Sequence, residues 1–182
     1  MAAALALLAG CYPAPPYENP LTPDQVRTLR VKKISFLPHR SRRATAAEVD
    51  LYRRFALRSA ACSLGERFDR AAGTAVLTFS IRELEVAHGG GEISVASALS
   101  ARIEGPGIEG DYRTGPHTDA RKDVPNPPSV AEQARFQAAG IVERLLSVRG
   151  EGYPRDSPYD MTPLPPCLAR LLADIDALPP GR

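Results

Sequence analysis

The sequence is poor in the side chains that build most catalytic and metal sites. Its 182 residues include three cysteines, three histidines and no tryptophan. No two cysteines or histidines have the spacing of a zinc-ligand pair, and no Gly-x-Ser-x-Gly, His-x-x-x-His or Walker-type motif occurs. The histidines, His39, His88 and His117, all fall in expected turns or loops. We therefore expect no metal site, no cofactor and no enzymatic activity.

Lysine and long apolar runs are also scarce. All but three of the 23 cationic residues are arginine, the 21 acidic residues nearly balance them, and no basic block contains interleaved aromatic residues. Nucleic acid is therefore not an expected partner. The apolar run at residues 2–10 is far shorter than the roughly 20 residues that cross a bilayer. The remaining chain, with 43% hydrophobic and 24% charged residues overall, is typical of one globular domain.

The apolar run ends at Leu8-Ala9-Gly10-Cys11, which resembles the lipobox of bacterial lipoproteins. The resemblance implies that a lipid is attached to the sulfur of Cys11 and that the chain is cut before this residue. It also implies a position in the cell envelope facing the periplasm. The outer membrane is favoured, because Tyr12 is not the aspartate that retains lipoproteins at the inner membrane. The alternative is an alanine-rich N-terminus with a chance cysteine, since no basic residue precedes the run.

Five prolines within residues 12–24 and the lack of apolar periodicity predict an extended tether. We therefore divide the chain into three parts. Residues 1–10 are a signal-peptide remnant, residues 11–26 are a lipid-anchored proline-rich tether, and residues 27–182 are a single periplasmic domain.

Once Cys11 is acylated, Cys62 and Cys167 are left as an even pair in an oxidising compartment. A disulfide between them would tie the C-terminal segment to the first helix of the domain. The equally weighted alternative is that Cys62 is a small residue on a helix face and Cys167 is a free thiol.

The first half of the domain is expected to contain three strands and one helix. A strand is predicted at residues 27–37, and the capping box Thr45-Ala46-Ala47-Glu48 begins a helix. Residues 75–86 and 92–104 alternate between apolar and polar side chains, which predicts a long antiparallel hairpin that turns at the glycines after His88. The apolar phase of the first of these strands shifts after Arg82, as a β-bulge would cause.

The second half is expected to be mainly helical. A short edge strand is predicted at residues 108–113, followed by a polar excursion at 115–128 whose His117, Asp119 and Asp123 have no fixed geometry. The capping box that starts at Ser129 predicts a second helix ending at Gly150. A short final helix is predicted after Pro165-Pro166.

This order of elements predicts an α+β fold, in which an antiparallel sheet of three to four strands is covered on one face by two amphipathic helices, with a short C-terminal helix added. The layout is similar to that of small envelope lipoproteins, such as auxiliary subunits of lipid-trafficking ABC transporters and the lipopolysaccharide-assembly lipoprotein. That similarity implies a non-enzymatic accessory or assembly subunit that contacts the membrane through its lipid and binds an envelope protein. The alternative is a carrier of lipid or another small ligand, with an apolar cavity between sheet and helices.

Overall fold

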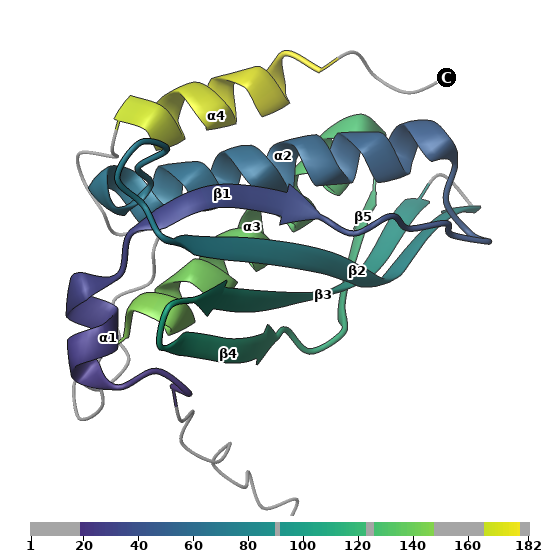
Figure 1. The fold of residues 1–182 in the computed structure, drawn as a ribbon. Coiled ribbons are helices and arrows are strands. Elements are labelled where there is room, and N and C mark those ends of the chain that lie inside the picture. Colours follow the sequence, from purple (N-terminus) through teal and green to yellow (C-terminus); the bar gives the residue numbers. More distant parts are fainter. Residues whose placement is uncertain (1–18, 90–91, 123–125, 148–165, 179–182) are drawn as a thin grey trace, which may run out of the picture.

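A five-stranded sheet lies at the centre of the structure, a computed structural model that describes residues 19–89, 92–122, 126–147 and 166–178 (Figure 1). The elements follow in the order α1 (Pro23–Thr28), β1 (Val31–Phe36), α2 (Ala46–Leu64), a 3-10 turn (Gly65–Arg67), β2 (Ala75–Gly89), β3 (Glu92–Gly105), β4 (Ile108–Arg113), β5 (His117–Lys122), α3 (Asn126–Leu146) and α4 (Pro166–Asp176). The predicted α+β class, with a mostly antiparallel sheet and several helices, is confirmed.

The hairpin of β2 and β3 is the longest pair of strands and agrees with the sequence pattern. The two strands pair antiparallel from Val76 opposite Glu104 to Gly89 opposite Glu92. Their register shifts between Ile81 and Glu83, which places the predicted bulge at Arg82. The apolar phase of the sequence shifts there because the bulge adds one residue and returns the following side chains to the buried face.

Helix α2 begins as the sequence predicts. The Thr45 hydroxyl accepts a hydrogen bond from the backbone N–H of Glu48, and the Glu48 carboxylate accepts one from the backbone N–H of Thr45. The helix ends at Leu64, and the C-cap residue Gly65 has a φ of 55°, in the left-handed region that glycine adopts without a steric cost. Its buried residues recur at three- and four-residue spacing, and α2 packs against α3 and β1.

The sheet is not wholly antiparallel, and this corrects the prediction. Strand β1 pairs with β2 in parallel, with Ile34 opposite Leu77 and Phe36 opposite Phe79. The reason is the connection through α2, because a crossover helix returns the chain to the end of the sheet at which β1 began. The other strand pairs, β2 with β3, β3 with β4, and β3 with β5, are antiparallel.

Three further boundaries differ from the prediction. The first strand begins at Val31 and not at residue 27, because residues 23–28 form α1. Residues 117–122, expected within a polar excursion, form strand β5, which pairs with residues 92–97 of β3. Helix α3 begins at Asn126 and not after Ser129. Pro127 and Pro128 fit this earlier start, because the first turn of a helix does not need the N–H groups that proline lacks.

The core lies between the sheet and the helices. Its largest fully buried side chains come from the strands, from α2, α3 and α4, and from the link between α1 and β1: Leu29, Tyr52, Leu77, Phe79, Leu84, Leu99, Ile103, Tyr112, Ile141, Leu145, Leu171 and Ile175. Tyr52 and Phe55 of α2 also belong to the core, with exposed fractions of 0% and 2%. The carrier hypothesis, which needs a cavity at this position, stays a prediction.

Candidate functional site

The predicted lipid site, Cys11, lies outside the residues that the structure describes, which begin at Asn19. The point at which the chain enters the domain is nevertheless described. Leu21 and Val26 are buried in the core, and residues 23–28 form α1. The last part of the predicted tether, residues 19–26, is therefore part of the domain, because its two apolar side chains pack into the core.

Asn19 fixes this entry point. Its amide nitrogen donates hydrogen bonds to the carbonyls of Arg144, Leu145 and Ser147 at 3.0, 3.0 and 2.7 Å. Its amide oxygen accepts hydrogen bonds from the backbone N–H of Leu21 at 3.0 Å and from the Tyr112 hydroxyl at 2.8 Å. The last carbonyls of a helix have no partner within the helix, so Asn19 satisfies the C-terminal end of α3 and joins it to β4.

Helix α1 holds the same segment in place, and sequence reasoning missed it. Thr22 and Gln25 form a capping box with Pro23 at the first helical position. The Gln25 side chain also donates to the carbonyl of Gly107 at 2.6 Å, in the turn between β3 and β4. The signal was present in the sequence as Thr-x-x-Gln with proline inside it, but the many prolines around it favoured an extended segment.

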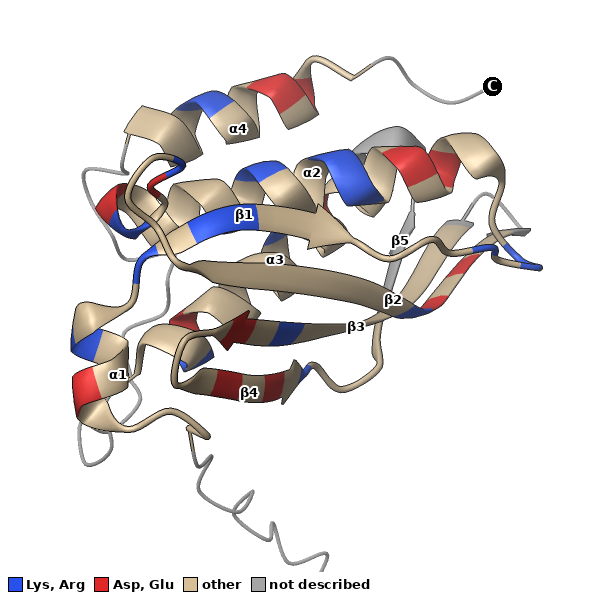
Figure 2. Ribbon diagram, viewed as in Figure 1, with Lys and Arg blue, Asp and Glu red and all other residues tan. Residues whose placement is uncertain are grey.

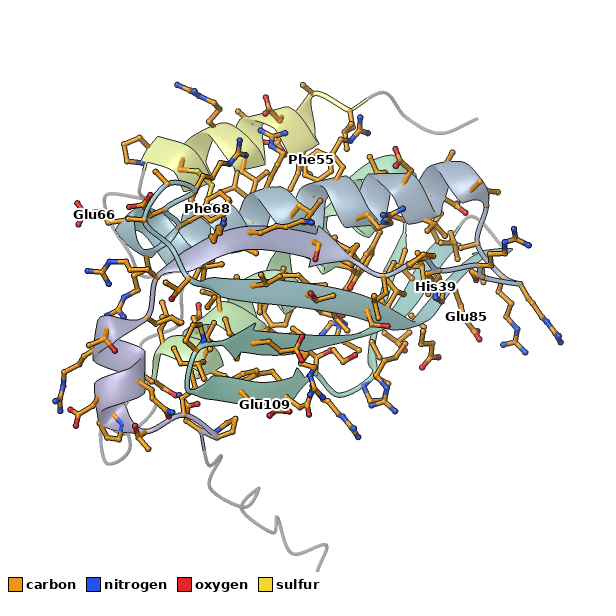
Figure 3. All side chains as sticks on the ribbon, viewed as in Figure 1. His39, Phe55, Glu66, Phe68, Glu85 and Glu109 are labelled. Atoms are coloured by element: carbon orange, nitrogen blue, oxygen red, sulfur yellow. A yellow bond between two sulfur atoms is a disulfide. The ribbon has the colours of Figure 1, made fainter. Side chains whose placement is uncertain are left out.

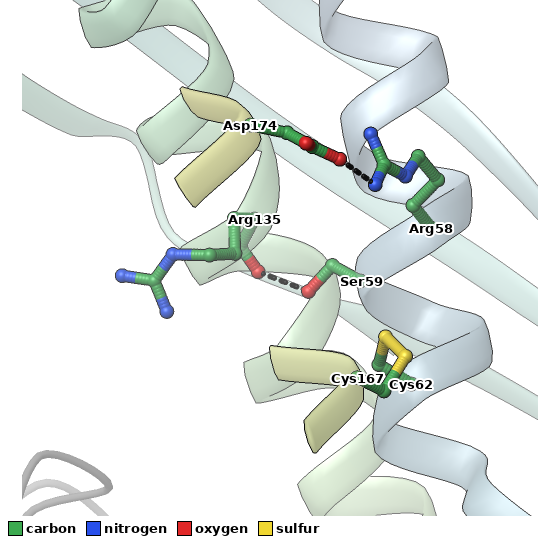
Figure 4. The surroundings of a disulfide bond; sticks show 6 residues. All are labelled: Arg58, Ser59, Cys62, Arg135, Cys167 and Asp174. Carbon is green, nitrogen blue, oxygen red and sulfur yellow. Dashed lines mark hydrogen bonds and ion pairs between the residues drawn. A yellow bond between two sulfur atoms is a disulfide. The ribbon is translucent and has the colours of Figure 1, made fainter. Parts of the chain in front are cut away.

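Cys62 and Cys167 form a disulfide in the structure, with their Cα atoms 5.7 Å apart (Figure 4). Cys62 lies near the end of α2 and Cys167 in the first turn of α4, 105 residues further along the chain. Beyond the disulfide, α4 buries Leu171 and Ile175, and the side chains of Arg58 and Asp174 form an ion pair between α2 and α4. The disulfide therefore fastens a helix that also has apolar contacts of its own.

A buried polar network joins α2, α3 and β3. The Tyr52 hydroxyl donates to the Gln137 side-chain oxygen at 2.7 Å, and the Gln137 amide donates to the carbonyl of Ser97 at 2.7 Å. A further link runs from the Ser59 hydroxyl to the carbonyl of Arg135 at 2.8 Å (Figure 4). Burial raises the pKa of Tyr52, because the charged phenolate would be desolvated. The network fixes the register of the two helices on the sheet.

Polar side chains occupy the outward positions of the sheet. The register aligns Ser35, Thr78, Arg102 and Asp111 across β1, β2, β3 and β4. The hydroxyls of Ser35 and Thr78 lie 3.1 Å apart and share a hydrogen bond. These positions alternate with buried residues such as Leu77 on β2, so they form the surface of the sheet that points away from the core.

The β4 side of this surface is acidic (Figure 2). Arg102 forms ion pairs with Glu104 at 2.9 Å, with Glu109, and with Asp111 at 3.7 Å. A hydrogen bond from Arg102 to Glu104 and the charges of the three carboxylates raise the pKa of Arg102. One guanidinium faces three carboxylates, so the cluster carries a net negative charge.

The sequence-predicted excursion does not assemble into a described metal or acid–base cluster. The His117 side chain is exposed, and its ring centre lies 5.6 Å from that of Phe136 on α3. The side chain of Asp119 and all of Asp123 lie outside the described residues. Among the side chains that can be described, no three histidine, cysteine, aspartate or glutamate residues are grouped as metal ligands. The absence of enzymatic activity stays a prediction.

Comparison with known proteins gives a distant likeness only. The sequence matches no family model and no curated protein. Two solved structures resemble the fold weakly. The PelC dodecamer from Paraburkholderia phytofirmans is 14% identical with a TM-score of 0.42, covering 66% of this chain and 90% of its own. A proposed lipoprotein from Caulobacter crescentus CB15 is 13% identical with a TM-score of 0.38, covering 68% and 88%. No described helix of this chain is long and apolar enough to cross a membrane.

Proposed function

We propose that the protein is a lipid-anchored periplasmic lipoprotein that acts as a non-enzymatic accessory or assembly subunit of a cell-envelope complex, preferably at the outer membrane. The lipobox-like Leu8-Ala9-Gly10-Cys11 supports the anchor. The observation that carries the proposal is the position of Asn19, which ties the chain into the domain soon after Cys11.

The short distance along the chain between these two residues limits how far the domain can lie from a membrane. A fully extended chain covers at most about 3.5 Å per residue, so the segment from Cys11 to Asn19 spans no more than roughly 28 Å. An anchored domain is therefore held close to the bilayer, with α1 and the C-terminal end of α3 nearest to the lipid. Such a position suits a subunit that binds a membrane-associated protein complex.

The open face of the sheet is the proposed docking surface. The face of the sheet that points away from the core would present Ser35, Thr78 and Arg102 to a partner. The carboxylates around Arg102 favour a partner with a basic patch, because complementary charge speeds encounter and excludes wrong partners. The edge of β1 beyond Val31, a residue that bridges Phe68, is a second route, through addition of a strand.

The anchor is tested by mass spectrometry of the mature N-terminus from isolated envelopes. We expect a chain that starts at Cys11 and carries the added mass of the lipid. The Cys11→Ser variant should appear in the soluble periplasmic fraction, whereas the matched Cys62→Ser/Cys167→Ser variant should stay in the membrane fraction. An unmodified Cys11 still preceded by Gly10 would rule out the anchor.

The docking surface is tested separately with a photo-crosslinking amino acid in the full-length protein in cells. Placed at Thr78 on the open face, it should yield one dominant cross-linked envelope protein. Placed at Ala173, an exposed position on α4, it should not. The docking proposal fails if position 78 yields no cross-linked protein, or if positions 78 and 173 yield the same cross-linked proteins.

A further inference from the structure

The chain leaves β1 at the end of the strand that is opposite to α1 (Figure 1), and beside that end lies a cleft lined by nine residues, four of which are arginine. It has a volume of about 300 Å³ and is formed by residues 39–43, which follow β1, and residues 82–85 of β2. Figure 3 shows His39 and Glu85 at this end of the molecule. None of the lining residues belongs to the acidic cluster around Arg102.

Hydrogen bonds hold the first of these segments against β2. The Ser41 hydroxyl donates to the carbonyl of Leu84 at 2.7 Å and accepts from the backbone N–H of Arg43 at 3.0 Å. The backbone N–H of Val86 donates to the carbonyl of Arg43 at 2.9 Å, and Arg43 and Glu85 form a parallel bridge. The arginines of this segment are therefore carried on an ordered backbone, which lowers the entropic cost of binding a ligand.

The β-bulge supplies the arginine on the other wall. Ile81 pairs with Leu99 and Glu83 with Ala98, so Arg82 is the additional residue of β2. Its side chain is exposed and lines the cleft. Bulges re-aim side chains and are common beside functional sites. The irregularity that the sequence pattern revealed thus places a cation next to the basic segment.

The charges of the cleft are unbalanced. Arg43 is neutralised by Glu85, because one guanidinium nitrogen donates to both carboxylate oxygens at 2.8 and 2.6 Å. Arg40, Arg42 and Arg82 are exposed and form no ion pair among the described residues, and Glu83 is the other acid of the lining. Like charges gathered in a concave surface repel one another and attract a counter-ion of opposite sign.

One polar atom of the lining also lacks a partner. The Nε2 atom of His39 is buried and makes no hydrogen bond within the described part of the chain. Buried polar atoms normally have a partner. A ligand in the cleft can supply it, either directly or through water.

We propose that this cleft is an anion-binding site that takes a phosphate-sized oxyanion on Arg40, Arg42 and Arg82. Guanidinium groups suit this ligand because their planar fork donates two parallel hydrogen bonds to phosphate or carboxylate oxygens. The oxyanion can belong to a free phosphate compound or to a lipid headgroup, which share this chemistry.

The site is tested with the full chain carrying Cys11→Ser, so that no attached lipid contributes to binding. Pyrophosphate binding is measured by calorimetry at low salt, and binding to phosphatidylglycerol vesicles by flotation. Arg40→Gln/Arg42→Gln/Arg82→Gln is compared with the charge-matched control Arg54→Gln/Arg113→Gln/Arg170→Gln, which alters three arginines that are exposed elsewhere.

We expect the cleft variant to bind pyrophosphate at least about tenfold more weakly, with the control variant changed by less than about twofold. Loss of vesicle binding in the cleft variant alone would likewise support the site and identify a lipid headgroup as the source. The proposal is overturned if the starting protein binds neither probe, or if the two variants lose binding equally. If circular dichroism shows that the triple variant does not fold, the single variant Arg82→Gln is used in its place. Its binding of pyrophosphate and of vesicles is then compared with that of the same control variant.

Discussion

Asn19 and Tyr112 share a buried hydrogen bond of 2.8 Å although 93 residues separate them in the chain. The same asparagine side chain also holds three carbonyls at the C-terminal end of α3. The entry of the chain, strand β4 and helix α3 therefore meet at one amide group. This arrangement sets where the domain begins, and under the proposed anchor it also sets which end of the domain lies nearest to the lipid.

We predict that Asn19→Ala lowers the free energy of unfolding by about 2–3 kcal/mol, measured by urea denaturation. The change removes the amide donor of the Leu145 and Ser147 carbonyls and the amide oxygen that accepts from the Tyr112 hydroxyl. The control is Tyr112→Phe, which removes the hydrogen bond from the Tyr112 hydroxyl to Asn19 and should cost about 1 kcal/mol. If Asn19→Ala costs no more than this control, the amide does not fix the entry of the chain.

Local patterns made part of the fold predictable. Alternation along residues 75–86 and 92–104 predicted the hairpin, and the shift of phase after Arg82 predicted its bulge, because a strand's side chains alternate between faces. The pair Thr45 and Glu48 predicted the start of α2, because its hydrogen bonds join residues only three positions apart. Each of these signals lies within a few residues of the structure that it specifies.

Contacts between distant residues were not predictable in the same way. The parallel pairing of Val31 with Ala75 depends on how α2 packs, and no residue of β1 carries that information. His117 pairs with Ser97, and the polar, proline-flanked segment that it begins forms a strand. This pairing uses backbone hydrogen bonds, so the side chains of the segment do not reveal it. The contacts of Asn19 depend likewise on elements more than 90 residues away. The basic cleft joins residues 39–43 to residues 82–85, and the sequence shows them only as separate arginines.

A second prediction concerns the disulfide. We expect the Cys62→Ser/Cys167→Ser variant to lose about 2–4 kcal/mol of unfolding free energy, because the bond closes a long loop and restricts the unfolded chain. In unreduced protein neither cysteine should react with an alkylating reagent, and both should react after reduction in denaturant.

The matched control is Arg58→Gln, which breaks the neighbouring ion pair with Asp174. Those side chains are 40% and 46% exposed, so the loss should be less than about 1 kcal/mol. Alkylation of both cysteines without a reductant would show that the two thiols are free. An equal loss in the two variants would show that the cross-link contributes no more than a surface contact.

A third prediction concerns the capping box of α2. We expect Thr45→Ala to cost about 1 kcal/mol in the free energy of unfolding, because the backbone N–H of Glu48 loses its acceptor. Ala47→Ser, at an exposed position in the same turn, is the control and should change stability by less than half as much. Equal effects of the two substitutions in urea denaturation would contradict the role of the cap.

The last prediction is a pH dependence that belongs to Tyr52. Burial raises the pKa of this hydroxyl in the folded protein, whereas in the unfolded chain tyrosine titrates near pH 10. Above about pH 10 the unfolded state loses this proton and the folded state keeps it. Unfolding then becomes easier as the pH rises, by up to about 1.4 kcal/mol per pH unit. The stability that Tyr52 contributes is fully present below pH 10 and is lost above it.

Tyr52→Phe separates this effect from the other titrating groups. At pH 8 the variant should be less stable than the starting protein by about 1 kcal/mol, because the Gln137 side-chain oxygen loses its hydrogen-bond donor. Urea denaturation from pH 8 to 11 should then show the difference between the two proteins shrinking above pH 10, because the variant has no phenol at this position to deprotonate. A difference that stays constant across this range would mean that the hydroxyl titrates alike in the folded and unfolded chains, and that the network of Tyr52, Gln137 and Ser97 is open to water.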